Sequence, residues 1–259
     1  MRKLYFVTLL LLIVCMGCQW QMRPADEEAV ASTFIVRYDQ VERRYLTTGD
    51  FSSLQQLQTL YPRETRTLIE DVLRLGRVDD VDINQRFLTF FQDSTLQALI
   101  DDVDSLYDDL SDVDSRLRLA FDRLQQLLPD VNVPHVYTQV GSLDQSIIVS
   151  DSMLGISLDK YLGESHPVYL RYGYSEEQRR SMTRDFIVPD CIGFYLLSLY
   201  PQPEEATAEQ RRQHMAKIQY VVNKVLGQPV FTGDDVVRVA DSLKGRGTFD
   251  INSLLGTLL

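Results

Sequence analysis

The sequence is poor in the residues from which metal and redox sites are built. Its 259 residues include only three cysteines and three histidines. His135, His166 and His214 are far apart in the chain, whereas a structural zinc site needs four ligands, usually as close cysteine or histidine pairs. We therefore expect no metal and no other cofactor, and we expect the histidines to be surface or turn residues rather than catalysts.

Common catalytic motifs are lacking as well. The stretch "GISLD" misses the second glycine of a GxSxG nucleophile elbow, and no GxxxxGK[ST] phosphate loop occurs. The aspartate-rich run "DDVDSLYDDLSDVD" has neither the glycine nor the glutamate that an EF-hand calcium loop requires. Because apolar residues recur along it at helical spacing, its aspartates are expected on the solvent face of a helix.

The N-terminal residues predict a bacterial lipoprotein signal peptide. The basic residues Arg2 and Lys3 precede an apolar run, Leu4–Val14, which suits a signal peptide and is too short to span a bilayer comfortably. In the following "CMGC", Gly17 is the small residue needed before cleavage, and Cys18 resembles the lipidated cysteine of a lipobox. The match is imperfect, since Cys15 stands where leucine is usual.

We therefore expect a lipoprotein signal peptide over residues 1–17, a lipid on Cys18 and a tether over residues 18–28. A secreted protein without a lipid is the alternative. The lipid would hold the protein on a membrane of the bacterial cell envelope, inner or outer, most readily on the periplasmic side. Cleavage would leave Cys191 as the single thiol, so no internal disulfide is expected.

Negative charge is in excess. The chain has 26 basic and 37 acidic residues, a formal net charge of −11. Such a charge disfavours nucleic acid and anionic lipid headgroups as partners. The expected partners are the membrane, through the lipid on Cys18, and other envelope proteins.

Apolar spacing divides the rest of the chain into three regions within one domain, residues 29–259. Residues 29–128 and 175–259 have helical periodicity, whereas residues 135–158 contain three short β-rich runs typical of an antiparallel meander. The prediction is an α+β fold, mostly helical with a small central meander. Predicted helix boundaries are a continuous helix face from Val30 to Tyr45 ended by "TGD", Pro62 at a helix start, a break capped by Ser111, an interruption at Pro189, and a helix from Thr207 to Gly227.

Zincin-type peptidases have the same order of elements: a helical region, a small sheet and a further helix. There the edge strand binds extended substrate, and the next helix carries HExxH with two metal-binding histidines. Here that helix reads "RDFIVPDCIGFYLL" and has Pro189 and Gly193 at the four-residue spacing. Asp190 and Cys191 could ligate a metal in principle, but adjacent residues point about 100° apart on a helix.

The stretches "VPHVYTQVGSLDQSIIVSDSMLGISLDKYLGESHPVY" and "RDFIVPDCIGFYL", with the lipobox start, resemble the gliding-motility lipoprotein B (GldB-like) family. The resemblance implies a cell-envelope lipoprotein with a zincin-like fold that lacks the HExxH metal motif. It also implies an association with surface motility and its secretion machinery, and it transfers no catalytic residue to this chain.

Two interpretations of "DKYLGESHPVY" remain open. The residues could bind a peptide, because a tyrosine-rich loop joins the sheet to the next helix; the candidates are Asp159, Tyr161, Gly163, His166, Tyr169 and Asp190. Alternatively Asp159 caps a turn, Gly163 supplies a positive φ and the tyrosines pack.

The predicted function is that of a non-enzymatic interaction or assembly component. The alternative is a zincin-like peptidase with a degenerate or unrecognised site that acts on envelope peptides. A third class, a protein that binds a soluble ligand, would have a large apolar pocket away from the sheet edge.

Overall fold

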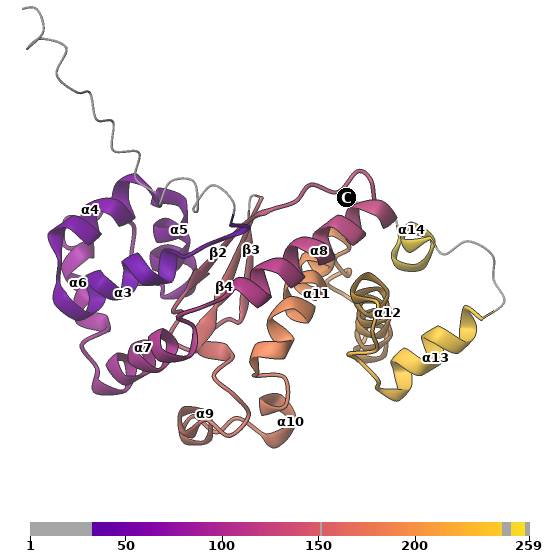
Figure 1. The fold of residues 1–259 in the computed structure, drawn as a ribbon. Coiled ribbons are helices and arrows are strands. Elements are labelled where there is room, and N and C mark those ends of the chain that lie inside the picture. Colours follow the sequence, from indigo (N-terminus) through magenta and orange to yellow (C-terminus); the bar gives the residue numbers. More distant parts are fainter. Residues whose placement is uncertain (1–32, 151, 245–249, 257–259) are drawn as a thin grey trace, which may run out of the picture. The chain divides into compact units, whose positions relative to one another are not determined.

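Helices lie on both sides of a small sheet in the computed structural model of the chain (Figure 1). The structure describes residues 33–150, 152–244 and 250–256, and Phe34–Leu259 forms one compact unit. The signal peptide, Cys18 and the tether lie outside the described residues, so their assignment remains a prediction.

Most of the described residues are helical, as predicted. The α-helices are α3 (Tyr38–Thr48), α4 (Phe51–Thr59), α5 (Pro62–Arg66), α6 (Ile83–Phe90), α7 (Ser94–Leu106), α8 (Ser111–Leu127), α9 (Pro167–Arg171), α10 (Glu176–Arg179), α11 (Ile187–Leu199), α12 (Ala208–Leu226), α13 (Asp234–Ser242) and α14 (Ile251–Leu255). A π-helical turn, Thr67–Val72, continues α5, and short 3₁₀ turns occupy Leu158–Lys160 and Arg184–Phe186.

The sheet has four strands in the order β1 (Ile35–Val36), β2 (His135–Gln139), β4 (Met153–Ser157), β3 (Ile147–Ser150). The three β-rich runs form strands, but the predicted antiparallel meander is wrong. Strand β4 returns between β2 and β3, so that it runs parallel to β2 and antiparallel to β3. The parallel pairing places Gly155 opposite Tyr137, and a Cβ at Gly155 would lie 2.6 Å from the Tyr137 ring. The missing side chain thus gives the ring the space this register needs.

Strand β1 was not predicted. It interrupts the region from Val30 to Tyr45, so the continuous helix expected there is wrong. The backbone N–H groups of Phe34 and Ile35 both donate to the Asp114 carboxylate on α8, at 2.7 Å each. Ile35 and Val36 pair with β2 instead of forming a helical turn, and α3 begins at Tyr38. Partners distant in sequence have therefore overridden the local apolar spacing.

Predicted helix boundaries that depend on local chemistry are confirmed. Helix α3 ends at Gly49 with a φ of 68°, and α5 begins with Pro62. The Thr207 side chain accepts a hydrogen bond from the Gln210 N–H in a capping box at the start of α12, which Gly227 ends with a φ of 70°.

Two boundary predictions are wrong in detail. The chain does break between α7 and α8, but the side chain of Asp109, not Ser111, accepts the hydrogen bond there, from the Ser111 N–H at 2.8 Å. Pro189 does not interrupt a helix, because α11 begins only at Ile187. Proline in the first turn removes an N–H that has no intrahelical acceptor in any case.

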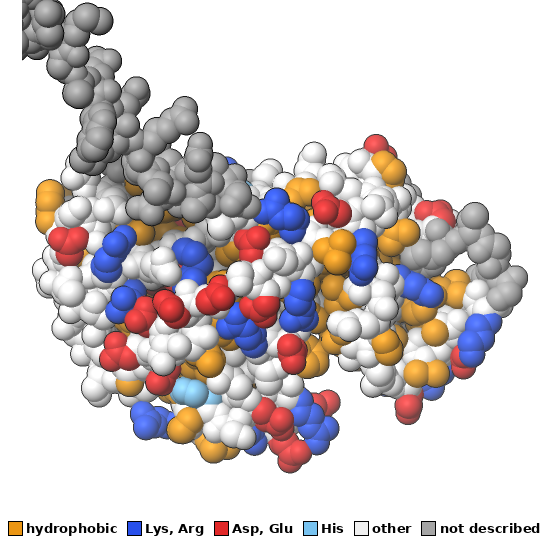
Figure 2. Space-filling view, in the orientation of Figure 1, with side chains coloured by type: hydrophobic (Ala, Val, Ile, Leu, Met, Phe, Trp, Pro, Cys, Tyr) orange, Lys and Arg blue, Asp and Glu red, His pale blue; other side chains and the backbone are white. Residues whose placement is uncertain are grey.

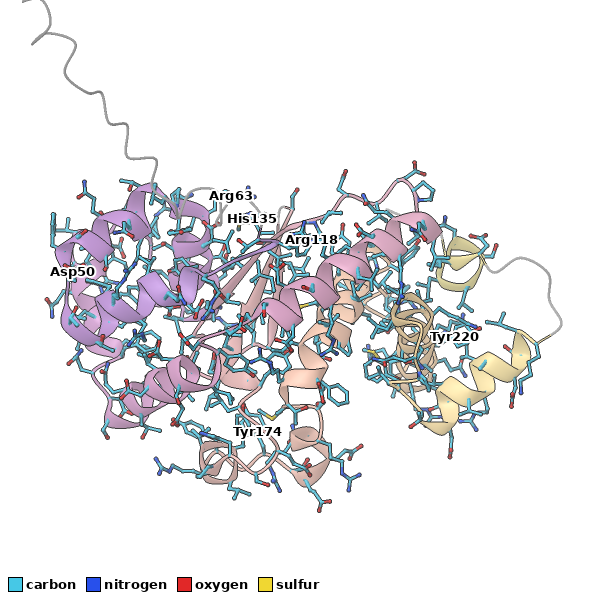
Figure 3. All side chains as sticks on the ribbon, in the orientation of Figure 1. Asp50, Arg63, Arg118, His135, Tyr174 and Tyr220 are labelled. Atoms are coloured by element: carbon cyan, nitrogen blue, oxygen red, sulfur yellow. The ribbon has the colours of Figure 1, made fainter. Side chains whose placement is uncertain are left out.

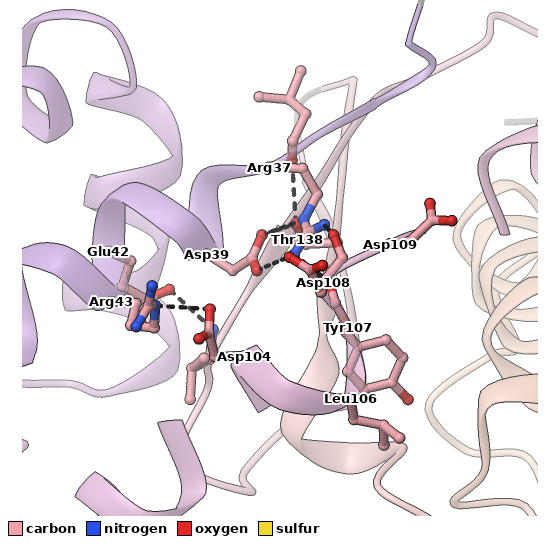
Figure 4. Close-up of polar contacts among 12 residues, drawn as sticks. Arg37, Asp39, Glu42, Arg43, Asp104, Leu106, Tyr107, Asp108, Asp109 and Thr138 are labelled. Atoms are coloured by element: carbon pink, nitrogen blue, oxygen red, sulfur yellow. Dashed lines mark hydrogen bonds and ion pairs between the residues drawn. The ribbon is translucent and has the colours of Figure 1, made fainter. Parts of the chain in front are cut away.

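Polar contacts join the start of α3 to β2 and to the end of α7 (Figure 4). The Arg37 guanidinium donates to both Asp39 carboxylate oxygens at 2.9 Å and to the Tyr107 carbonyl at 2.6 Å. Asp39 in turn accepts a hydrogen bond from the Thr138 hydroxyl on β2. This buried network fixes α3 and α7 against the carboxyl end of β2.

Candidate functional site

The main candidate site is a cleft at the start of β3, the edge strand of the sheet, where Ser146 lines it. It has a volume of about 470 Å³. Helix α11, which packs against β3, β4, α8 and α12, contributes Asp190 and Phe194 to its lining. The cleft is lined by Ser146, Lys160, Tyr161, Tyr174, Gln178, Ser181, Met182, Asp190, Phe194, Gln219 and Phe231. Figure 3 shows Tyr174 between α9 and α10.

The positions of α11 that line the cleft are not Pro189 and Gly193, which have the spacing of HExxH ligands. Asp190 and Phe194, four residues apart, line the cleft. Pro189 is buried, and a Cβ on Gly193 would meet Val222 of α12, so neither faces the cleft. The correction follows from helix rotation, since residues one position apart point about 100° apart. Phenylalanine cannot bind a metal, so the spaced pair on this helix supplies a single carboxylate.

Asp190 and Tyr161, two of the predicted binding residues, come together in the cleft. The Tyr161 hydroxyl donates to Asp190 Oδ2 at 2.8 Å. Burial raises the pKa of the Asp190 carboxyl to about 7, although the Tyr161 hydrogen bond opposes this. The carboxyl can therefore gain or lose a proton near neutral pH. The neighbouring Cys191 is fully buried, and burial raises the pKa of its thiol well above the usual value.

Asp159 and Tyr169 are placed to hold the loop after β2. Asp159 is fully buried, and its two carboxylate oxygens accept hydrogen bonds from the Gly141 N–H at 2.7 Å and the Leu143 N–H at 2.6 Å. Burial raises the pKa of Asp159, and these two donors oppose the shift. The Tyr169 hydroxyl donates to the Asp159 carbonyl and accepts from the Leu162 N–H, both at 2.8 Å. Neither side chain lines the cleft.

Gly163 and His166 lie away from the cleft. Gly163 has the predicted positive φ, 111°, and its N–H donates to the Met182 carbonyl. His166 lies in a separate cavity of about 450 Å³ beside α7, where its Nε2 is 3.2 Å from Asp102. The six candidates therefore divide into a cleft pair (Tyr161 and Asp190), a pair that holds the loop after β2 (Asp159 and Tyr169), and two residues away from the cleft, Gly163 and His166.

The other histidines each have a partner of their own. His135 Nε2 lies 2.9 Å from Glu64, and His214 Nε2 lies 2.8 Å from the Tyr200 carbonyl. Within the described ranges, no three histidine, cysteine, aspartate or glutamate side chains converge where they could hold a metal ion.

Several residues of interest were missed from the sequence. Lys160 donates to the Tyr174 hydroxyl at 2.9 Å and the Leu143 carbonyl at 3.2 Å at the rim of the cleft. Glu42 is fully buried and accepts a hydrogen bond from the Val140 N–H at 3.0 Å, while burial raises its pKa well above the usual value. The sequence did indicate that Glu42 is buried, since Glu42 shares the apolar face of its helix with Tyr38 and Tyr45.

Comparison with known proteins places the chain in a family. A family model described as gliding motility protein GldB matches residues 21–229. The chain belongs to the gliding motility protein GldB family. The resemblance seen in the sequence is thereby confirmed, although the matched residues begin after Cys18. No curated protein and no solved structure matches the chain.

Membership in the family assigns the chain to gliding-motility-associated lipoproteins of the cell envelope. In the part of the chain that the structure describes, no helix combines the length and hydropathy needed to cross a bilayer.

Proposed function

We propose that the protein is a non-catalytic assembly component held on an envelope membrane by a lipid on Cys18. Its cleft receives an extended segment of an envelope protein, which pairs with β3 and extends over α11. The partner belongs to the machinery of surface motility or to the secretion apparatus that serves it. The fold that supports this role is zincin-like, with the metal motif replaced.

The observation that carries the proposal is the edge position of β3. It pairs with β4 on one side, and no other described strand pairs with its other side. In the antiparallel register Ser150 is opposite Met153 at the turn, and the Ser157 N–H donates to the Ser146 carbonyl at 3.0 Å. Hydrogen-bonded pairs alternate along such a ladder, so the Val149 N–H and C=O point away from β4. These groups can form a ladder with an added strand.

Substitution of Val149 provides the test. Val149→Pro removes the outward N–H and leaves the ladder to β4 intact, because that position does not donate to β4. Val149→Thr is the matched control, since it keeps the N–H and the β-branched shape. A photo-crosslinking amino acid at Phe194, whose side chain is 41 % exposed, reports what enters the cleft in intact cells.

We expect crosslinks from position 194 to an envelope protein, retained with Val149→Thr and lost with Val149→Pro. A crosslinker at Leu119 on the exposed side of α8 serves as the position control. Equal crosslinking with the proline and the threonine variants would contradict strand pairing.

The lipid anchor is tested separately by Cys18→Ala. The variant should leave the membrane fraction after cell breakage, because a lipid attached at Cys18 supplies the membrane affinity. If the membrane fraction contains as much of the variant as of the wild-type protein, the anchor lies elsewhere.

A peptidase is the second candidate, and the Asp190–Tyr161 pair is the observation in its favour. A carboxyl with a pKa of about 7 in a cleft that accepts extended peptide suits general acid–base chemistry. Stoichiometric zinc in the purified protein, or peptide cleavage that Asp190→Asn abolishes, would favour the peptidase over the assembly component.

A further inference from the structure

A second cavity, of about 410 Å³, lies between α12 and α13. Its lining is mainly apolar, with Tyr220, Phe231, Val236, Val237 and Ala240 among its residues. Figure 3 shows Tyr220 on α12. Apolar side chains also gather around α12 and α13 on the face shown in Figure 2. Helix α13 follows the residues matched by the family model, so this cavity is partly built by residues outside that match.

The wall of this cavity is held in place before any partner arrives. The Asn223 side chain accepts from the N–H groups of Val230 and Phe231 at 2.9 Å and donates to the Phe231 carbonyl at 2.7 Å. The Phe231 ring also packs edge-on against Phe186, with centroids 6.1 Å apart. A cavity formed in advance loses less entropy on binding than one that must be ordered.

Phe231 belongs to both cavities. It lines the cleft beside β3 and the cavity between α12 and α13, so the two adjoin across one aromatic ring. Phe194 in the first cavity and Val237 in the second are 41 % and 48 % exposed. A segment that occupies the cleft thus has an apolar site next to it.

The cleft and the second cavity together are lined by more basic than acidic side chains, whereas the whole chain has a negative net charge. The charged residues among the lining of the two cavities are Lys160, Asp190 and Lys224, in a chain whose net charge is −11. Lys224 Nζ lies 5.3 Å from the Tyr220 ring centroid at the edge of the second cavity. Acidic residues of a partner are attracted to these lysines, although the net charge of the chain is negative.

We propose that the segment that pairs with β3 is acidic and carries a large apolar side chain, which fills the cavity between α12 and α13. The inference rests on the proposed function and specifies the chemistry of the partner. The lysines select the acidic residues, and the cavity selects the size of the apolar side chain.

The test uses the full-length lipoprotein in detergent and short fluorescent peptides of alternating aspartate and threonine with one phenylalanine. Peptides with lysine in place of aspartate, or with alanine in place of phenylalanine, are the matched probes. We expect the acidic phenylalanine peptide to bind most tightly, by a factor of about ten, which corresponds to about 1.4 kcal/mol.

Two variants address the two determinants. Lys224→Glu should weaken binding of the acidic peptide about tenfold, whereas Lys217→Glu, on the same helix but outside both cavities, should leave it unchanged. Ala240→Leu fills the second cavity and should weaken the phenylalanine peptide while leaving the alanine peptide unaffected. Circular dichroism and the melting temperature confirm that each variant is folded.

The outcomes separate the inference from the proposed function. If Val149→Pro abolishes peptide binding while Lys224→Glu and Ala240→Leu leave it unchanged, β3 receives a strand but this inference is wrong. If Val149→Pro has no effect on any peptide, strand pairing is wrong. Tighter binding of the lysine peptide would also overturn the inference.

Discussion

Asp159 and Asp190 are both aspartates withdrawn from solvent beside the same sheet, yet their surroundings give them different roles. Asp159 accepts two backbone N–H groups and faces no cavity, so its carboxylate completes the loop after β2. Asp190 accepts a hydrogen bond from the Tyr161 hydroxyl and lines the cleft. A buried carboxylate with all its oxygens bonded maintains structure, whereas one with spare capacity beside a cleft is available for binding or proton transfer.

The loop held by Asp159 has an unusual backbone. Ser142 and Leu143 both have positive φ, 54° and 66°. Non-glycine residues pay a conformational cost there, so the surrounding contacts must compensate. The Asp159 carboxylate supplies part of that compensation, and the loop leads directly to Ser146 and β3.

The largest expected loss of stability is therefore at Asp159. Asp159→Asn replaces one acceptor oxygen with an NH₂ group that faces a backbone N–H. We expect the free energy of unfolding to fall by about 3 kcal/mol, because one of the two backbone N–H groups then faces the amide NH₂ and has no acceptor at a fully buried site. Urea unfolding measures it. A loss below about 1 kcal/mol would remove the distinction between the two aspartates.

Asp190→Asn should have the opposite effect at neutral pH. The pKa of Asp190 is raised in the folded protein from 3.8 to about 7, so the folded state holds a proton that the unfolded state releases. Wild-type stability should thus fall as the pH rises from about 4 to about 7, and stay level above it. The amide needs no proton, so the variant should gain about 4 kcal/mol relative to wild type across this window, at about 1.4 kcal/mol for each of its roughly three pH units.

The measurement is urea unfolding of both proteins at several pH values. The stability difference between the variant and wild type isolates Asp190 from other titrating groups. A difference that stays constant across the window would show that Asp190 titrates normally.

The smallest expected change in stability comes from removing the hydroxyl of either tyrosine beside these aspartates, Tyr161 or Tyr169. Tyr161→Phe removes the hydroxyl that lowers the pKa of Asp190, so it should cost about 1 kcal/mol and move the upper end of that pH window upward. Tyr169→Phe makes the same chemical change beside Asp159. It should cost a similar free energy without moving the window, which pH-dependent unfolding of both variants would check.

The sequence predicted features whose causes are local. Gly49, Pro62 and Thr207 mark helix ends through backbone chemistry that acts within a few residues, and these predictions are confirmed. Strand order depended on the register that brings Gly155 to Tyr137, and β1 depended on Asp114, 79 residues beyond Ile35. Such long-range partners leave no periodic pattern, so the sheet was assigned the wrong topology.

The candidate site was predictable to a similar extent. Tyr161 and Asp190 were among the predicted binding residues because a tyrosine-rich loop joins the sheet to the next helix, and both line the cleft. The sequence did not separate them from Asp159 and Tyr169, since burial and bonding decide that difference. Phe231 was missed because its position depends on Asn223 and on the packing of α12 against α13.

Strand β1 has a mechanical consequence. Tension that reaches the compact unit from the N-terminal side of the chain arrives at Phe34, directly before β1. Two hydrogen bonds to Asp114 and a two-residue pairing with β2 resist this tension. The Asp114 carboxylate thus connects this part of the chain to α8, and a pull from the N-terminal side would be transmitted into the helix and the sheet together.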